Sequence, residues 1–357
     1  LGASKASENA EFHFLCLPTP ARTDGSSDLS YFEEGINEIL SVLQPNSIVI
    51  NKSTVPLGTA KRLQQDMART DVHIVSNPEF LSEGNAIRDF LEPSRIVIGA
   101  NSREHSERVA KLYSKLNAPI LMSSWESAEL IKHTANAFLA MKLTFVNEIA
   151  TLCEMTGADI KDVTDGIGYD PRIGSDYMNA GPGWGGSCFP KDSASLAQVA
   201  RSFGFDFTLL EHTIDLNQKH LDRTAQKVQH LVPTGSPHKK VAAWGLTFKA
   251  GTDVLGFSPA VEVLKRLEAD DYEILAFDPT VKENLTQLAS TVIMDDPYGC
   301  VNGADALIVL TEWKDFKLLD MKAVAKSMRN ANLIDTRNIF DRNEMEKIGF
   351  TYVGMGV

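Results

Sequence analysis

Residues 181–192 read Gly-Pro-Gly-Trp-Gly-Gly-Ser-Cys-Phe-Pro-Lys-Asp and combine a bendable backbone with a nucleophile. The four glycines permit sharp turns and let another molecule approach the chain closely. Pro190 is typical of a first helical turn, so we expect Cys188 at a helix N-terminus, where free amides and the helix dipole favour a thiolate. Lys191 adds positive charge nearby, and Asp192 could transfer protons. A turn beside a buried cysteine is the simpler alternative, but the combination favours a nucleophile.

A second set of polar residues follows three predicted strands. The apolar runs 12–17, 47–51 and 72–76 end just before Thr19, Thr54 and Glu79, respectively. In open α/β sheets, ligands bind at the carboxyl ends of the strands. Any one of these residues could simply belong to a turn, but three in succession favour a shared cleft.

The elements that must position these residues alternate between strand and helix over the first part of the chain. Further strands are predicted at 95–99 and 120–122, with helices at 28–43, capped by Asp28, and at 103–116. A long helix is predicted over 125–155, with apolar residues on more than one face. Lys132 and Asn136 lie four residues apart on it and so share a face, which by itself fits a solvated surface equally well. A second helix is expected at 159–166 and another long helical stretch at 211–231.

The last third of the chain returns to alternating strands and helices. Strands are predicted at 241–246, 273–277, 306–310 and 333–334. Phe248 and Lys249 follow the first of these and could offer a ring for a base and a cation for a phosphate. Arg337 follows the last and offers a fork-shaped phosphate partner. Such residues also decorate the rims of many sheets, so the ligand reading and the surface reading stay equally open.

Composition limits the possible functions. The 357 residues, 43% of them hydrophobic, suffice for two or three domains. A net charge of −12 argues against affinity for nucleic acid or anionic membranes. No apolar run has the length of a membrane span, and no secretory leader opens the chain. The four cysteines show no metal-type spacing, so we expect no metal site and a cytoplasmic location.

Several separate motifs together resemble the UDP-glucose/GDP-mannose dehydrogenase family of nucleotide-sugar dehydrogenases. The likeness runs from about residue 12 to about residue 338. It rests on Pro18-Thr19-Pro20, Lys-Ser-Thr-Val-Pro at 52–56, Asn-Pro-Glu-Phe-Leu-Ser-Glu-Gly at 77–84, Ala-Asn-Ala-Phe-Leu-Ala at 135–140, Arg-Ile-Gly at 172–174, the cysteine loop and Gly-Leu-Thr-Phe-Lys at 245–249. The serine and phenylalanine that flank Cys188 resemble the enzymes of glucose type, whereas relatives acting on N-acetylated sugars tend to carry histidine before the cysteine.

The resemblance implies a fold and a division into domains. Two Rossmann-like domains with parallel sheets are expected, joined by a central helical region that contains the long helix and forms a homodimer. The implied divisions are residues 1–117 for the remainder of an NAD-binding domain, 118–231 for the central domain and 232–357 for a domain that binds the UDP-sugar.

The resemblance also implies a reaction. Such enzymes oxidise the C6 alcohol of UDP-glucose to a carboxylate with two molecules of NAD. The thiolate that matches Cys188 attacks the intermediate aldehyde, and the thiohemiacetal so formed is oxidised to a thioester and hydrolysed. Lys132 and Asn136 match the pair that stabilises negative charge on the sugar oxygen. Asp192 matches a carboxylate for proton transfer, Thr54 lies beside the reacting centre, and Glu79 is implicated in hydrolysis.

Binding residues carry over in the same way. The sugar nucleotide is expected to contact the following residues: Glu79, Phe80, Leu81, Glu83, Lys132, Asn136, Tyr177, Asn179, Gly185, Phe248, Lys249 and Arg337. Arg172 matches an arginine that reaches the partner subunit's site. Cofactor contacts are expected from Leu17, Pro18, Thr19, Pro20, Ala21, Ser53, Thr54, Glu83 and Lys191.

Two departures leave alternatives open. The family opens with a Gly-x-Gly-x-x-Gly turn that holds the cofactor pyrophosphate, and this sequence has none, so about seventy residues of the family pattern are expected to be missing. The family usually carries a cofactor-binding arginine where this chain has Gly256. A truncated relative that binds sugar nucleotides without transferring hydride therefore remains an alternative, as does a dehydrogenase acting on TDP-glucose or GDP-mannose.

Overall fold

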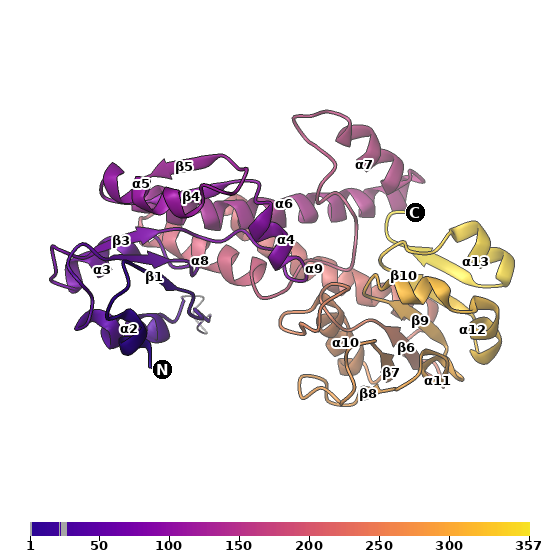
Figure 1. Ribbon diagram of the computed structural model, residues 1–357. Coiled ribbons are helices and arrows are strands. Elements are labelled where there is room, and N and C mark those ends of the chain that lie inside the picture. Colours follow the sequence, from indigo (N-terminus) through magenta and orange to yellow (C-terminus); the bar gives the residue numbers. More distant parts are fainter. Residues whose placement is uncertain (1, 21, 23–26) are drawn as a thin grey trace. The chain divides into compact units, whose positions relative to one another are not determined.

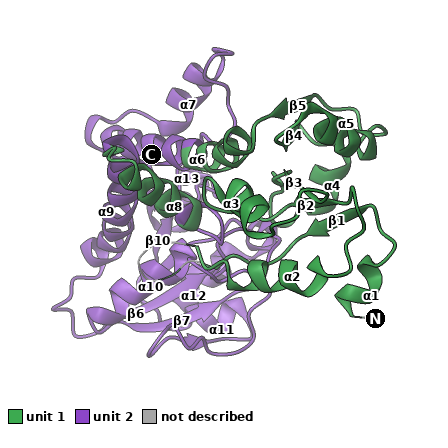
Figure 2. Cartoon of the chain, turned by 90° about the vertical axis from the view of Figure 1, so that its left-hand side faces the viewer, with its two compact units in different colours: residues 1–137, 191–207 green, residues 138–190, 208–357 purple. Residues whose placement is uncertain are grey.

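The computed structural model describes residues 2–20, 22 and 27–357. The chain divides into two compact units, which are coloured separately in Figure 2. Unit 1 comprises Leu1–Ala137 and Lys191–Phe207, and unit 2 comprises Phe138–Pro190 and Thr208–Val357. Two helices run through the division, α6 (Trp125–Thr156) and α8 (Phe189–Ser202).

Within its described residues, unit 1 contains a five-stranded sheet in the order β1-β2-β3-β4-β5 (Figure 1). Its strands are β1 (Phe12–Leu15), β2 (Ile48–Asn51), β3 (His73–Ser76), β4 (Ile96–Gly99) and β5 (Ile120–Ser123). Its helices are α1 (Ala3–Ser7), α2 (Ser30–Leu40), α3 (Thr59–Asp66), α4 (Ala86–Leu91) and α5 (Arg103–Leu112). All neighbouring strands are parallel except β3 and β4, which pair antiparallel through Ser76 and Gly99.

Helices cover both faces of this sheet, because apolar residues alternate between two cores. Val49 packs with α2 and α3 on one face, whereas Ile48 and Ile50 pack with α5 on the other. A strand buried on both sides is typical of parallel sheets with helical crossovers. The carboxyl ends of β1, β2 and β3 consequently meet at one edge.

Unit 2 contains, in the part that the structure describes, a parallel six-stranded sheet in the order β11-β10-β9-β6-β7-β8. Its strands are β6 (Lys240–Trp244), β7 (Glu273–Phe277), β8 (Val292–Ile293), β9 (Ala306–Val309), β10 (Asn332–Asp335) and β11 (Thr351–Gly354). Its other elements are α7 (Ile160–Gly168), α9 (Thr208–Leu231), α10 (Pro259–Ala269), α11 (Pro297–Val301), η1 (Lys314–Leu318), α12 (Met321–Ser327) and α13 (Arg342–Ile348).

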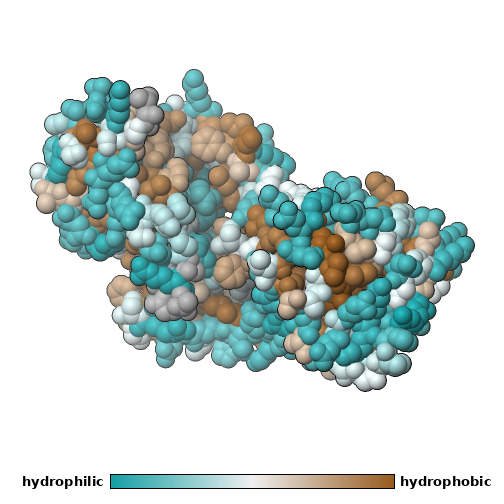
Figure 3. Space-filling model, turned by 90° about the horizontal axis from the view of Figure 1, so that it is seen from below, coloured by the Kyte–Doolittle hydropathy of each residue, from teal (hydrophilic) through white to brown (hydrophobic). Residues whose placement is uncertain are grey.

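The second sheet is also covered on both faces. Val241 and Ala243 of β6 pack with α9 and α10, whereas Ala242 and Trp244 pack with α11, α12 and α13 (Figure 1). The expected class of two Rossmann-like sheets with helices is therefore confirmed. On the face drawn in Figure 3, apolar side chains gather in several groups between polar ones. None of the described helices combines the length and the apolar character that a membrane crossing requires.

Some expected boundaries were wrong. Helix α2 begins at Ser30 and ends at Leu40, and its N-cap position is Leu29 rather than Asp28. Asp28 instead accepts a hydrogen bond from the backbone N–H of Ser30 over 3.0 Å and pairs with Arg22. Strands β8 and β11 were not predicted, because β8 has only two residues and β11 has little apolar alternation.

Candidate functional site

Two loops at the strand ends of unit 1 are joined by side-chain hydroxyls. Ser53 Oγ donates to the carbonyl of Leu17 over 2.7 Å and accepts from the Leu17 N–H over 2.9 Å. Thr19 Oγ1 donates to the carbonyl of Thr54 over 2.8 Å. The residues expected to contact a cofactor after β1 and β2 therefore form one connected edge.

Helix α6 brings Lys132 to the loop that follows β3. Lys132 Nζ is buried and lies 2.9 Å from Glu79 Oε1, and it lies 5.4 Å from the ring centre of Phe80. Glu79 Oε2 accepts a hydrogen bond from the Leu81 N–H over 2.5 Å. Glu83 follows in the same half-buried loop. The ion pair orders a segment that was expected to hold the sugar.

One helical turn further along α6, Asn136 contacts a carboxylate from α8. Asn136 Nδ2 donates to Asp192 Oδ2 over 2.6 Å, and both side chains are buried. Lys191 Nζ lies 2.9 Å from Asp192 Oδ1 outside hydrogen-bond geometry, so this contact is an ion pair. One carboxylate oxygen of Asp192 thus accepts a hydrogen bond from Asn136, whereas the other is paired only electrostatically with Lys191.

Glu129, one turn before Lys132, holds the start of α3. Its carboxylate accepts from the backbone N–H groups of Gly58 over 2.6 Å and Ala60 over 2.8 Å. Burial raises the pKa of Glu129 to about 7, although these hydrogen bonds oppose the shift. Together with Ser53 and other residues, Glu129 and Lys132 line a cavity of about 10 Å³.

In unit 2, the glycine-rich loop packs closely onto the strand ends of the second sheet. A Cβ on Gly185 would lie only 1.9 Å from the carbonyl oxygen of Phe257, and one on Gly181 would lie 3.0 Å from Arg337 Nη1. The Gly186 N–H donates to the Phe257 carbonyl over 3.2 Å. The glycines are therefore needed for contact, and they deliver the half-buried Cys188 directly before α8.

Polar side chains of two helices fix this loop. Asn147 of α6 accepts from the Gly181 N–H over 3.0 Å, and His220 of α9 lies 2.7 Å from the Gly181 carbonyl. Asn217 of α9 exchanges two hydrogen bonds with the backbone of Trp184, over 2.9 and 3.0 Å. Burial lowers the pKa of His220. The loop is thereby held at several points before it reaches Cys188.

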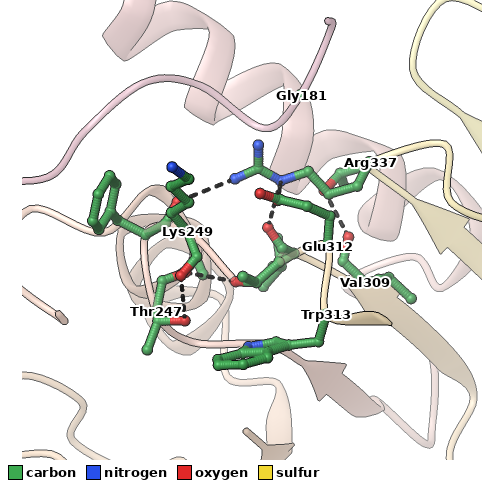
Figure 4. Close-up of polar contacts among 12 residues, drawn as sticks. Gly181, Thr247, Lys249, Val309, Glu312, Trp313 and Arg337 are labelled. Atoms are coloured by element: carbon green, nitrogen blue, oxygen red, sulfur yellow. Dashed lines mark hydrogen bonds and ion pairs between the residues drawn. The ribbon is translucent and has the colours of Figure 1, made fainter. Parts of the chain in front are cut away.

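Basic and aromatic residues converge at the exits of β6, β9 and β10 (Figure 4). Arg337 Nε donates to the carbonyl of Leu310 over 2.9 Å and lies 3.1 Å from Glu312 Oε2. Arg337 Nη2 lies 3.4 Å from the carbonyl of Phe248, to which it donates. Among the described residues, Lys249 Nζ has no hydrogen-bond or ion-pair partner.

The remaining predicted residues of unit 2 lie in the exposed loop after α7. The Arg172 side chain is 88% exposed and makes a bidentate contact with Asp170. Tyr177 adopts a positive φ of 60°, and its ring lies 6.2 Å from that of Phe189. Asn179 is exposed.

The predicted residues thus form two groups, each within one unit. In unit 1 the structure brings together Leu17, Thr19, Ser53, Thr54, Glu79, Phe80, Leu81, Lys132, Asn136, Lys191 and Asp192. In unit 2 it brings the loop containing Gly185 against Phe248 and Arg337, with Lys249 beside them.

Sequence reasoning missed three buried or half-buried ionisable residues. Glu129 holds α3, and Asp278 binds the backbone that precedes Phe248. Lys52 Nζ donates to Asn77 Oδ1 over 3.3 Å, and burial lowers its pKa to about 8. For Glu129, a signal existed in the sequence, since it lies three residues before Lys132 and so shares its helix face.

The strand ends of unit 1 fit the nicotinamide end of NAD. Hydroxyl and backbone groups predominate there, of which Ser53 Oγ and Thr19 Oγ1 donate to backbone carbonyls and keep lone pairs that can accept, and neither segment 17–20 nor segment 52–58 contains an acidic residue. Such groups suit a carboxamide and ribose hydroxyls. Pro18 and Pro20 are exposed at the same edge, and Ala21 lies outside the described residues.

Comparison with known proteins gives the family. Three domain models of the UDP-glucose/GDP-mannose dehydrogenase family match the chain: the NAD binding domain at residues 2–117, the central domain at 126–219 and the UDP binding domain at 242–342. UDP-glucose 6-dehydrogenase of Rhizobium meliloti is 41% identical over 96% of the chain and 81% of the relative. The enzyme of the same name from Pseudomonas aeruginosa is 37% identical over 98% of the chain and 81% of the relative.

Solved structures agree with this match. A UDP-glucose dehydrogenase from Pyrobaculum islandicum superposes with a TM-score of 0.88 at 29% identity and covers 99% of the chain and 82% of that structure. A UDP-D-ManNAc dehydrogenase from Pyrococcus horikoshii reaches the same TM-score at 26% identity, covering 100% and 83%. The chain therefore belongs to the UDP-glucose/GDP-mannose dehydrogenase family.

Proposed function

We propose that this protein is an NAD-dependent UDP-glucose 6-dehydrogenase, which oxidises the C6 alcohol of UDP-glucose to a carboxylate. The observation that carries the proposal is the 41% identity, over 96% of the chain, to an enzyme of that name. The thiol of Cys188, half-buried at the start of α8 on a tightly packed glycine loop, supports the covalent part of the reaction.

Cys188 acts as the nucleophile between two oxidations. Loss of a hydride and a proton from the C6 alcohol gives an aldehyde, and the thiolate adds to its carbon to form a thiohemiacetal. Loss of a second hydride gives a thioester, and water then releases the carboxylate and restores the thiol. Two molecules of NAD, bound one after the other, would each accept one of these hydrides. Sulfur suits this sequence because it adds readily to a carbonyl and leaves readily from an acyl group.

Residues of unit 1 stabilise charge and move protons in this scheme. Lys132 and Asn136 donate to the oxygen on which negative charge develops. Asp192 exchanges protons with water, a role that its directed bond from Asn136 supports by fixing one carboxylate oxygen. Glu79 assists the hydrolysis of the thioester, and its ion pair with Lys132 keeps the two groups adjacent. The nicotinamide end of NAD is held by Leu17, Pro18, Thr19, Pro20, Ser53, Thr54, Glu83 and Lys191.

Residues of unit 2 bind the nucleotide. The ring of Phe248 supports the base, and Lys249 and Arg337 neutralise the diphosphate. The ammonium of Lys249, which has no partner among the described residues, supports this assignment because an isolated cation at a strand end favours an anion. The sugar contacts the loop that contains Tyr177, Asn179 and Gly185.

The active protein is a homodimer, formed through α6, in which Arg172 completes the partner subunit's site. Phe138, Phe145 and Leu152 follow one another at intervals of seven residues along α6, and each is about half exposed. A stripe of this spacing is typical of a helix that packs against another helix. The largely exposed Arg172 side chain supports its reach beyond its own subunit.

The functional divisions are residues 1–117 for the cofactor, 118–231 for dimerisation and catalysis, and 232–357 for the UDP-sugar. The structure describes all four cysteines and joins none of them in a disulfide, which supports a reducing compartment and hence the cytoplasm.

The test is to incubate the protein with UDP-glucose and NAD and to count the NADH formed per sugar consumed. Two NADH per UDP-glucose would support the complete reaction. If no NADH forms but the UDP-sugar still binds, the protein is a binding protein and not a dehydrogenase. If TDP-glucose or GDP-mannose is turned over faster than UDP-glucose, that sugar nucleotide is the substrate instead.

A further inference from the structure

The carboxylate of Asp278 joins the exits of three strands in unit 2. Asp278 follows β7 and is 0% exposed. Its Oδ2 accepts from the N–H groups of Leu246 over 2.8 Å and Thr247 over 3.2 Å, which follow β6. The same oxygen accepts from Trp313 Nε1, after β9, over 3.1 Å. Its Oδ1 accepts from the Thr280 N–H over 2.9 Å and Thr280 Oγ1 over 2.8 Å.

The segment held by Asp278 is also bound from its other side. Thr311 Oγ1, at the end of β9, donates to the carbonyl of Thr247 over 2.6 Å (Figure 4). The backbone directly before Phe248 and Lys249 is thus fixed by both neighbouring strands. Little freedom remains in the backbone that carries the ring and the ammonium.

Burying a carboxylate costs free energy unless hydrogen bonds replace its hydration, and here donors reach both oxygens. We propose that Asp278 is a positioning residue for nucleotide binding: it preorders the loop so that Phe248 and Lys249 stand ready for a nucleoside diphosphate. The inference rests on the proposed function, because that function assigns the nucleotide to this edge of the sheet. Preordering raises affinity because less motion has to be lost on binding.

The substitution Asp278→Asn tests this directly. An amide has the shape of the carboxylate, but its NH₂ group must face N–H donors on one side, either Leu246, Thr247 and Trp313 or Thr280. The loop should then shift or loosen. We expect the dissociation constant for UDP, measured by calorimetry, to rise at least about tenfold.

Asp305 provides a matched control in the same sheet. It is 2% exposed and accepts from the Lys240 N–H over 3.0 Å and from Arg329 and Asn330. It precedes β9, so it lies at the opposite edge from Asp278. Asp305→Asn should lower the melting temperature comparably, yet leave the UDP dissociation constant within about twofold of wild type, since it holds no part of the loop.

The outcomes separate cleanly. UDP binding by Asp278→Asn as tight as that of wild type would overturn the inference, and so would an equal loss in Asp305→Asn, because the effect would then be general destabilisation. If Asp278→Asn does not fold, Thr311→Val provides a second test, because it removes only the hydrogen bond from Thr311 to the Thr247 carbonyl. This variant should still bind UDP more weakly than wild type. Unchanged UDP affinity in Thr311→Val would also overturn the inference. A wild-type protein that does not bind UDP would instead overturn the proposed function.

Discussion

Asn136 Nδ2 donates a hydrogen bond of 2.6 Å to Asp192 Oδ2, joining a residue of the long helix α6 to the first turn of α8. Both side chains are buried, so the contact is shielded from water. Cys188 directly precedes α8, and Asp192 lies in the first turn of that helix, four residues after the nucleophile. The pair therefore links the residue proposed for charge stabilisation with the residue proposed for proton transfer.

Asp192→Asn should lower kcat by about two orders of magnitude, because the amide cannot exchange protons as the carboxylate does. UDP-glucose binding, measured by calorimetry, should change little, since the amide oxygen can still accept from Asn136. The exposed Asp215, which pairs with Lys219 on α9, gives the control variant Asp215→Asn, with unchanged kcat. An Asp192→Asn enzyme of full activity would remove Asp192 from the mechanism.

Cys188→Ser should nearly abolish turnover while it leaves UDP-sugar binding largely intact. A serine hydroxyl is a much weaker nucleophile than a thiolate at neutral pH, so the aldehyde would not be captured. The measurement is NADH formation beside calorimetric binding of UDP-glucose. Cys153, buried in the apolar cluster between α6 and α7, supplies the control Cys153→Ala, which should retain activity. Equal activity in Cys188→Ser would rule out the covalent route.

The elements and the groups of residues at strand ends could be predicted from the sequence because their signals are local. The continuous apolar run of β2 and the uninterrupted α6 are both visible in consecutive residues. The start of α2 was misplaced because Asp28 also forms a local contact outside the helix, with the Ser30 N–H. A two-residue strand such as β8 carries too few residues for any periodicity.

The residues that hold the site in place could not be predicted, since their partners are far away in the sequence. Asp278 binds the backbone of Leu246, 32 residues earlier, and Glu129 binds Ala60, 69 residues earlier. Both bonds depend on how strands and helices are arranged in space. The helix face that Glu129 shares with Lys132 indicates that it lies near the site, but no local pattern shows that its carboxylate accepts hydrogen bonds from the N-terminus of α3.

Gly185→Ala should destabilise the protein and lower turnover. The added Cβ would lie 1.9 Å from the Phe257 carbonyl oxygen, so the loop containing Cys188 would have to move, at a cost of roughly 1–3 kcal/mol. Gly166→Ala on α7 is the control, because its Cβ meets nothing within 4 Å and should stabilise the helix by about 0.5–1 kcal/mol. Thermal unfolding and kcat measure both. Unchanged values for Gly185→Ala would show that the loop does not need close contact.

Glu129 should make stability depend on pH. Its pKa is raised by burial from 4.5 to about 7, so between these values the folded protein binds a proton that the unfolded chain releases. The stabilisation is full below about pH 4.5 and is lost as the pH rises through about 7, amounting to a few kcal/mol. Glu129→Gln cannot titrate, so the difference in unfolding free energy between wild type and variant should vary with pH in this window. A constant difference from pH 4.5 to 8 would contradict the raised pKa.

Arg172→Ala should weaken the use of UDP-glucose through the dimer, and mixing variants tests where the arginine acts. If each site combines its own Cys188 with the partner's arginine, Cys188→Ser and Arg172→Ala subunits are each inactive or weak as homodimers. A hybrid dimer of the two nevertheless contains one complete site. This is the site of the Arg172→Ala subunit, which has its own Cys188 and receives the intact Arg172 of the Cys188→Ser subunit. Unfolding and refolding an equal mixture should therefore restore about a quarter of wild-type activity, since half of the dimers are hybrids and half of their sites are complete. Arg342→Ala, which removes an exposed arginine paired with Glu346, serves as the control and should keep full activity as a homodimer. If Arg172 acted within its own subunit, no site in the hybrid would be complete and mixing would restore nothing.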